Sequence, residues 1–184
     1  AWFVPDECQI RNPRHLRALA VAAAARGVEI SPCVEMLDVR LKSNRVDVVE
    51  TSAGTIRAGA YCFAAGAWTS LLSSRFANLV AVRPVRGQIV LLQCRKPTVR
   101  HIVHQGPRYL VPRPDGRLLI GSTEDEAGFD RRATPLGIAG LLQFAIDVAS
   151  ELADAEIERA WGGLRPAAAD GVPLLGRLAN IENA

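Results

Sequence analysis

Residues 109–121 read YLVPRPDGRLLIG, which has the pattern of two strands around a turn. Its two ends are short apolar runs, and Pro114, Asp115 and Gly116 lie between them. These three residues favour a tight turn, because proline restricts φ and glycine accepts a positive φ. We therefore predict a β-hairpin with strands at 109–112 and 117–121.

Apolar stretches on both sides extend this hairpin into a larger sheet. Residues 88–94 and 156–161 have the composition of strands. Thr134 and Pro135 predict the start of a long helix, because threonine caps helices and proline is tolerated in the first turn. Apolar residues spaced three and four apart are expected on one face of it: Ile138, Leu142, Ala145, Ala149 and Leu152.

The first part of the chain predicts a helix followed by a strand. Asn12 is the expected N-cap of an alanine-rich helix, with Pro13 at its first position. Gly27 is expected to end the helix in a left-handed conformation, and residues 28–30 predict a short buried strand. This helix–strand step is typical of doubly wound sheets.

Period-two alternation then predicts three short antiparallel strands, at residues 36–41, 45–51 and 55–57. The turns between them are expected at Ser43–Asn44 and Ala53–Gly54. The apolar run 61–65 predicts a buried strand that ends at Gly66, with a short helix at 67–73. The expected fold class is therefore α/β (or α+β).

Composition and charge exclude several classes of protein. Hydrophobic residues make up 49% and charged residues 22%, which is ordinary for a soluble globular protein. The net charge of +3 is spread along the chain, so we expect no nucleic-acid partner. No apolar run is long enough to cross a bilayer, so no membrane partner is expected. The four cysteines are far apart and predict reduced thiols in a cytoplasmic protein.

Common catalytic and phosphate-binding motifs do not occur in the sequence. GxGxxG, the P-loop, GxSxG and HExxH are all missing. His101 and His104 are three residues apart and would face opposite sides of a strand, so we expect no metal site. The acidic residues 124–126 are interpreted as a solvated loop rather than a cation site.

Residues 162–166, GGLRP, are the most informative segment for chemistry. Their glycines leave the backbone open to the close approach of a flat ligand. Arg165 offers a planar, permanently charged group that suits a carboxylate. The alternative is an ordinary surface arginine after a flexible turn.

Several segments occur together in one order along the chain. They are YCFAAGAW (61–68), RPVRGQ (83–88), YLVPR (109–113), GRLLIGST (116–123), WGGLRP (161–166) and DGVPLLG (170–176). Together they resemble the FAD-dependent D-amino-acid oxidase superfamily, and within it the glycine oxidases of thiamine biosynthesis. The resemblance covers nearly the whole chain.

The resemblance implies part of a doubly wound FAD-binding domain together with a mixed-sheet substrate domain. It places the central part of the FAD-binding domain at 6–77, the substrate domain at 78–169 and the return to the FAD-binding domain at 170–184. It also implies that the glycine-rich phosphate motif lies upstream of Ala1, so that the chain is an interior fragment.

The resemblance also implies roles for individual residues. Arg165 and Tyr109 correspond to the arginine and the tyrosine that hold the substrate carboxylate. The implied contacts with FAD are Met36, Ala65, Gly66, Trp68, Gly163 and Leu164. Core packing is the alternative role for Trp68 and Tyr109.

Two positions depart from the family pattern and bear on the substrate. Glu124 stands where related enzymes often have an apolar residue near the pocket wall. His104, or Val103 beside it, stands where the family can place a second tyrosine. An acid at position 124 would disfavour an acidic substrate and favour an additional amine.

The expected reaction is the oxidation of a glycine-like amino acid or amine by hydride transfer to FAD, with hydrogen peroxide formed from oxygen. A related dehydrogenase, or an oxidase of sarcosine, of D-amino acids or of a modified tRNA base, is an alternative. Another is a non-catalytic fragment that cannot hold FAD alone, because it lacks the pyrophosphate-binding turn. The expected partner is the small-molecule amino acid or amine, and self-association is left open.

Overall fold

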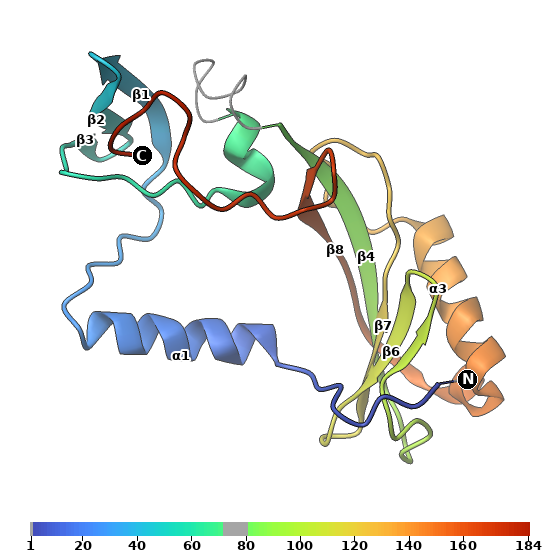
Figure 1. Ribbon diagram of the computed structural model, residues 1–184. Helices are drawn as coiled ribbons and strands as arrows, with labels where there is room; N and C mark the ends of the chain where they lie inside the picture. Colours follow the sequence, from blue (N-terminus) through green and yellow to red (C-terminus); the bar gives the residue numbers. More distant parts are fainter. Residues whose placement is uncertain (1, 72–80) are drawn as a thin grey trace. The chain divides into compact units, whose positions relative to one another are not determined.

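The computed structural model describes residues 2–71 and 81–184, which fall into two compact units (Figure 1). The first unit comprises Ala1–Phe63 and Gly176–Ala184, and the second comprises Ala64–Leu175. The domain boundary that the resemblance implies, between residues 77 and 78, lies outside the described residues. The implied domain limits therefore stay a prediction.

The first unit is built on a three-stranded antiparallel sheet in the order β1-β2-β3. Its strands are β1 (Met36–Lys42), β2 (Arg45–Thr51) and β3 (Gly54–Ile56), so the predicted meander is confirmed. Ser43 and Asn44 both have a positive φ, which is the geometry of a two-residue hairpin turn that matches the strand twist.

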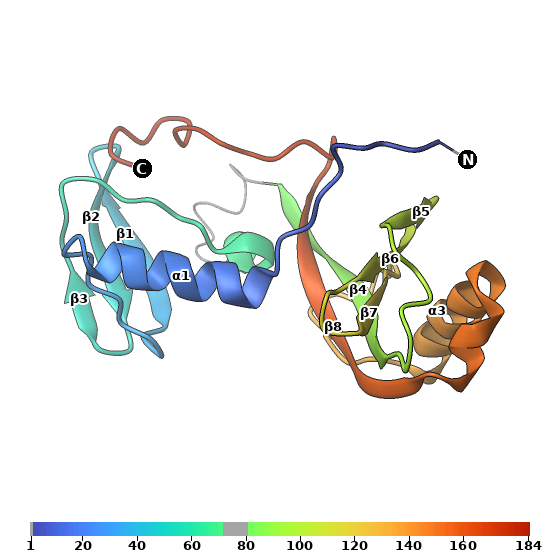
Figure 2. The same cartoon turned by 90° about the horizontal axis from the view of Figure 1, so that it is seen from below.

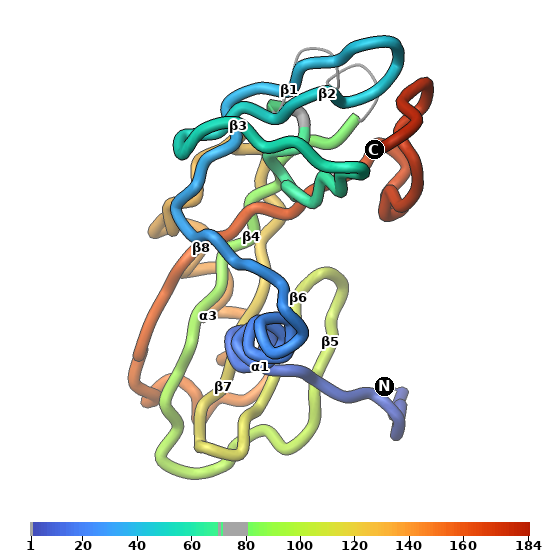
Figure 3. The backbone as a smooth tube through the Cα atoms, turned by 90° about the vertical axis from the view of Figure 1, so that its left-hand side faces the viewer, coloured from blue at the N-terminus to red at the C-terminus, as the bar shows by residue number. Residues whose placement is uncertain are grey.

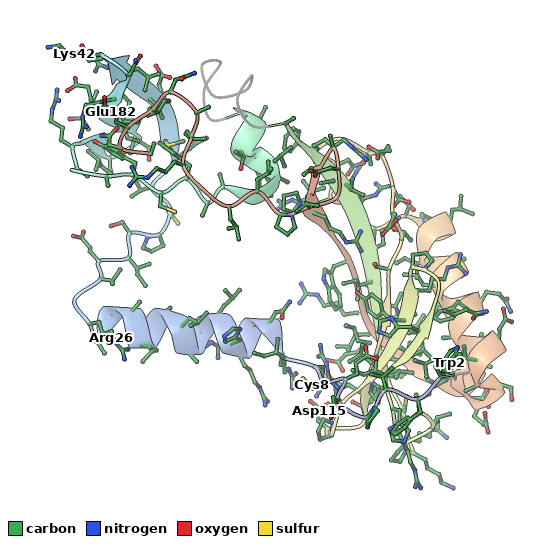
Figure 4. All side chains as sticks on the ribbon, in the orientation of Figure 1. Trp2, Cys8, Arg26, Lys42, Asp115 and Glu182 are labelled. Carbon is green, nitrogen blue, oxygen red and sulfur yellow. The ribbon has the colours of Figure 1, made fainter. Side chains whose placement is uncertain are left out.

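The last residues of the chain pack against this sheet. The side-chain amide of Asn183 accepts a hydrogen bond from the Val46 N–H (2.8 Å) and donates one to the Val46 carbonyl (3.0 Å). Glu182, labelled in Figure 4, forms an ion pair with Arg45 at 2.8 Å. These contacts explain why a C-terminal segment belongs to a unit formed mainly by N-terminal residues.

Helix α1 (Asn12–Ala24) has no side-chain cap at its start and is followed by a glycine turn. The prediction of Asn12 as N-cap is wrong: Arg11 holds that position, without a capping side chain, and Asn12 is already helical. The prediction for Gly27 is confirmed by its φ of +81°. The Val28 N–H donates to the Ala23 carbonyl across Gly27, as in a Schellman motif.

Two strands predicted from apolar runs are wrong. Residues 28–30 are exposed and irregular, and residues 61–65 are irregular as well. A strand needs a neighbour to pair its N–H and C=O groups, and within the described residues neither segment lies in a sheet. The Tyr61 N–H instead donates to the Asn183 carbonyl at 2.8 Å.

The second unit contains a five-stranded antiparallel sheet in the order β5-β6-β7-β4-β8. The strands are β4 (Val82–Gln93), β5 (Val103–Gln105), β6 (Arg108–Pro112), β7 (Arg117–Gly121) and β8 (Glu156–Ala168). The predicted hairpin is confirmed: β6 and β7 pair, and Gly116 in the turn has a φ of +81°.

Strand β8 is longer than its composition predicts. It continues through residues 162–166, where the alternative interpretation placed a flexible turn, and pairs with β4 along its length. The two strands run side by side in Figure 3. The segment that carries Arg165 is therefore regular backbone in the body of the sheet.

Helix α3 (Pro135–Val148) covers one face of this sheet (Figure 2). The Thr134 hydroxyl accepts the Gly137 N–H at 3.3 Å, which confirms the predicted cap. The helix ends at Val148, so the expected extension to Ala149 and Leu152 is wrong; Leu152 comes from the 3-10 helix η2 (Ser150–Asp154). The buried core comprises Val90, Leu92, Leu110, Leu118, Ile120, Leu141, Phe144, Ala145 and Leu152.

The short helix predicted at 67–73 is present as the 3-10 helix η1 (Gly66–Leu71). The end of that predicted helix, residues 72 and 73, lies outside the described residues. Across the described chain, no helix combines the length and apolar character needed to cross a bilayer. The four cysteines form no disulfide, and burial raises the pKa of the Cys94 thiol.

Gln88 links three segments of the second unit through its buried side chain, which belongs to a residue only 1% exposed. Its Oε1 accepts the N–H of Thr134 at the start of α3 (2.7 Å), and its Nε2 donates to Asp125 at 2.7 Å. Asp125 also accepts from the Thr123 hydroxyl (2.8 Å) and from Arg86 (3.1 Å). Burial raises the pKa of Asp125, but the hydrogen bonds from Gln88, Thr123 and Arg86 outweigh it and hold the pKa below its ordinary value.

The lowered pKa of Asp125 predicts how the stability of the unit depends on pH. A depressed native pKa gives stability that is complete above the unfolded-state value of 3.8 and is lost as the pH falls through the native value. We expect Asp125→Asn to lose about 1–2 kcal/mol of unfolding free energy at neutral pH. We also expect the stability of the variant to decline less steeply than that of the wild type as the pH falls below about 4.

Urea unfolding followed by circular dichroism at a series of pH values measures both effects. Glu151→Gln, at an exposed position in η2, is the matched control. Parallel wild-type and Asp125→Asn curves of stability against pH would contradict this account.

Candidate functional site

The pleat of β4 divides the sheet of the second unit into two faces. Val90 and Leu92 belong to the core under α3, and Gln88 bonds to Thr134 at the start of that helix. Since strand side chains alternate, Gly87 and Ile89 face the opposite side. We call this side, away from α3, the distal face.

Pairing between strands assigns further residues to the distal face. Gly163 lies opposite Gly87, Arg165 opposite Val85 and Trp161 opposite Ile89. Gly121 pairs with both Ile89 and Tyr109, and Tyr109 pairs with His104. The distal face therefore includes Val85, Gly87, Ile89, His104, Tyr109, Gly121, Trp161, Gly163 and Arg165.

Arg165 reaches across β4 from β8 to the segment that follows β7. Its Nη1 donates to the Thr123 carbonyl at 3.1 Å, and its Nη2 donates to the Ser122 hydroxyl. The guanidinium passes directly over Gly87, where a Cβ would lie 2.8 Å from its Cζ. A side chain at position 87 would therefore occupy the space that the guanidinium fills.

Tyr109 also lies over a glycine of a neighbouring strand. A Cβ at Gly121, its partner on β7, would overlap the tyrosine ring. The ring of His104 on β5 has its centroid 6.0 Å from that of Tyr109, at an interplanar angle of 57°. The structure thus brings Tyr109 and His104 together, on the same face as Arg165.

The two residues of GGLRP that were expected beside the flavin face different ways. Gly163 lies on the distal face with no atom within 4 Å of the position a Cβ would take, so its backbone is open to a flat group. Leu164 pairs with Arg86, and the pleat directs it to the α3 side. The sheet therefore brings Gly163, but not Leu164, to the face that carries Arg165.

The other expected FAD contacts are spread over both units. Trp68 in η1 lies against Phe129, with ring centroids 6.1 Å apart, but it is 42% exposed and so does not belong to a core. Ala65 precedes the same helix, and Gly66 is its first residue, with a φ of +55°. Met36 begins β1 in the first unit. The cofactor roles of these residues stay predictions.

Glu124 lies in an extended segment that runs beside β4. Asp125 exchanges two backbone hydrogen bonds with Arg86, each 2.9 Å long, and the Thr123 N–H donates to the Gln88 carbonyl at 3.4 Å. Glu124 is exposed, whereas the side chains of Thr123 and Asp125 bond to β4. Glu124 and Glu126 are exposed, as expected for a solvated loop, whereas Asp125 is bonded to β4 through both its backbone and its side chain.

Sequence reasoning missed several residues that shape the distal face. Gly87, Gly121, Ser122 and Thr123 all lie within the segments RPVRGQ and GRLLIGST, yet none carries an obvious chemical signal. The Arg86 side chain is only 11% exposed and pairs with Asp125 and with Asp130 at 3.5 Å. Only the register of the strands shows these contacts.

The arrangement is suited to holding an anion on the distal face. The bonds to Ser122 and Thr123 account for two of the five N–H donors that a guanidinium carries. A planar guanidinium can bind a carboxylate through two parallel hydrogen bonds. A phenol, an imidazole and an open glycine backbone lie on the same face.

The match to known proteins extends along the whole chain. The model of the family of FAD dependent oxidoreductases (DAO) matches residues 1–184. The glycine oxidase of Geobacillus kaustophilus (strain HTA426) is 35% identical over 177 residues, which are 96% of this chain and 47% of that protein. The glycine oxidase of Pseudomonas putida (strain KT2440) is 31% identical over 183 residues, which are 99% of this chain and 50% of that protein.

A solved structure agrees with these sequence matches. The glycine oxidase from Bacillus cereus ATCC 14579 superposes with a TM-score of 0.85 at 31% identity, covering 93% of this chain and 47% of that one. The mixed α/β class and the resemblance predicted from the sequence are confirmed, and the chain spans about half the length of the curated relatives it matches. With the family model matched from the first residue to the last, the chain belongs to the DAO family of FAD dependent oxidoreductases.

Proposed function

We propose that this chain forms the substrate-binding part of a flavin-dependent oxidase that acts on a glycine-like amino acid or a small amine. The position of Arg165 carries the proposal: its guanidinium lies flat over Gly87, one strand away from the open backbone of Gly163. A substrate carboxylate bound there would be oriented by a charge-assisted, bidentate contact. Tyr109 on the same face would supply a further hydroxyl donor.

The residues present fit the ring end of FAD. Gly163 has space above its Cα for a flat group, whereas the sequence lacks the GxGxxG turn that cradles a pyrophosphate. When bound, FAD would accept the hydride and return the electrons to oxygen as hydrogen peroxide. The chain itself would bind the carboxylate and hold the Cα–H in a reactive orientation, which is a large part of such catalysis.

The proposal includes a longer protein around this chain. The chain spans 47–50% of the two glycine oxidases, and a part without a pyrophosphate site would hold FAD weakly. We therefore expect the 184 residues by themselves to be inactive. The four unpaired cysteines favour a cytoplasmic location.

The substrate is proposed to be small and free of a second acidic group. His104 lies against Tyr109, and Glu124 is exposed in the segment that also supplies the Arg165 contacts. A carboxylate at position 124 would repel a second acid on the substrate and attract an additional amine. Glycine, sarcosine and small D-amino acids fit this description.

A peroxide assay on the full-length protein tests the reaction. After reconstitution with FAD, we expect glycine, sarcosine or a small D-amino acid to bleach the flavin absorbance and to release hydrogen peroxide in the presence of oxygen. Bleaching without peroxide would identify a dehydrogenase. A full-length protein that stays colourless after FAD is added would contradict the proposal.

Arg165→Ala tests the carboxylate site. Loss of a charge-assisted bidentate contact is expected to raise KM for carboxylate substrates about 100-fold, with a smaller effect on amines that lack a carboxylate. Arg165→Lys should recover only part of the affinity, because an ammonium cannot form two parallel bonds. Arg45→Ala, which removes an exposed partner of Glu182 in the first unit, is the control. An unchanged KM in Arg165→Ala would remove this residue from its proposed role.

Tyr109→Phe tests the contribution of the phenol. Removal of one hydroxyl donor is expected to raise KM for carboxylate substrates about 5- to 10-fold and to leave the fold intact. Tyr61→Phe, in the first unit, removes a hydroxyl that bonds to the Ala58 N–H at 2.8 Å and serves as the matched control. Equal effects of the two variants on KM would show that the phenol of Tyr109 acts through general stability alone.

A further inference from the structure

We propose that Ser122 and Gly87 are positioning residues for Arg165: the Ser122 hydroxyl and the Thr123 carbonyl hold the guanidinium in place over the bare Cα of Gly87. This inference rests on the proposed function, because it concerns the same arginine. Neither Ser122 nor Gly87 has an ionisable side chain. Together they would fix the position of the Arg165 guanidinium before a ligand binds.

The Arg165 side chain crosses a neighbouring strand. Arg165 starts on β8, whereas Ser122 and Thr123 follow β7, and β4 lies between those two strands. The guanidinium must cross β4 to reach its acceptors, and it crosses at Gly87. A Cβ built at position 87 would lie 2.8 Å from Cζ, Nη1 and Nη2 of Arg165, which is closer than Cβ atoms in proteins approach other heavy atoms. Glycine is therefore required for this placement of the arginine.

The segment that supplies the hydrogen-bond acceptors of Arg165 is held firmly against β4. The Gln88 N–H donates to the Thr123 hydroxyl at 3.1 Å, and that hydroxyl donates to Asp125 at 2.8 Å. Two backbone bonds between Arg86 and Asp125 hold the next residues against β4. The Thr123 carbonyl that accepts from Arg165 therefore belongs to an ordered backbone, and the Thr123 hydroxyl is itself held by Gln88 and Asp125.

Ser122 is buried. The residue is 3% exposed, and its hydroxyl accepts from Nη2 of Arg165. A group so covered acts on a ligand through the arginine rather than by touching it. Long arginine side chains lose rotamer freedom when a ligand orders them, and a side chain that is already held loses less. Ser122 and Gly87 are therefore expected to act on affinity for a carboxylate.

The test uses the full-length flavoprotein and three variants. Ser122→Ala is expected to raise KM for a carboxylate substrate about 5- to 10-fold with kcat within about twofold, and Ser122→Thr should restore most of the affinity. Gly87→Ala is expected to raise KM at least as much, because the added methyl displaces the flexible guanidinium rather than the backbone. Ser150→Ala, at an exposed position in η2, is the control and should change neither constant.

A double-mutant cycle separates positioning from general stability. In an Arg165→Ala background, Ser122→Ala and Gly87→Ala should cause no further rise in KM. In the wild-type background, neither of these two substitutions should change KM for an amine without a carboxylate. Independent effects in the two backgrounds would overturn the inference. An unchanged KM in Ser122→Ala in the wild-type background would overturn it as well.

A second measurement decides the inference even if the protein oxidises no amine. The Nε–H signal of Arg165, assigned in a ¹⁵N NMR spectrum by its loss in Arg165→Lys, should show an ordered side chain in the wild type. Ser122→Ala and Gly87→Ala should make it mobile, and Ser150→Ala should not. An equally ordered signal in all variants would refute the positioning role. A missing oxidase activity with a loosened signal would refute only the proposed function.

Discussion

The alternation of side chains along β4 is the constraint on which the second unit depends. Gln88 enters the helix-covered side, where its amide joins the start of α3 to Asp125. Its neighbour Gly87 faces the other way and leaves room for a guanidinium. Because adjacent residues of a strand point to opposite faces, one strand supports both the core and the candidate site. A shift of one residue in its register would exchange these two roles.

The parts of the fold that depend on local signals could be predicted from the sequence. The turn at Pro114–Gly116, the cap at Thr134 and the left-handed Gly27 each follow from the stereochemistry of a few adjacent residues. The two strands predicted at 28–30 and 61–65 fail, because an apolar run alone does not supply a pairing partner. The end of α3 at Val148 was missed since the apolar spacing continues beyond it.

For the candidate site, the sequence predicted which functional groups take part. It did not predict the face of the sheet on which each residue lies. Arg165 and Tyr109 stand out by their functional groups and by the resemblance that surrounds them. Leu164 shows the limit of that reasoning, because adjacency to Gly163 in sequence puts it on the other face of the strand. Gly87, Gly121 and Ser122 could not be recognised, since their importance arises only from contacts across strands whose register the sequence does not state.

The placement of Arg165 and Tyr109 over glycines of neighbouring strands affects how such proteins can be recombined. The shape of the distal face is encoded jointly by β4, β7 and β8, which are separated along the chain. A chimera whose crossover point falls between β4 and β8 could inherit the arginine from one parent and a bulky residue at position 87 from the other. Such a hybrid would keep every recognisable motif and still present its positive charge in the wrong place.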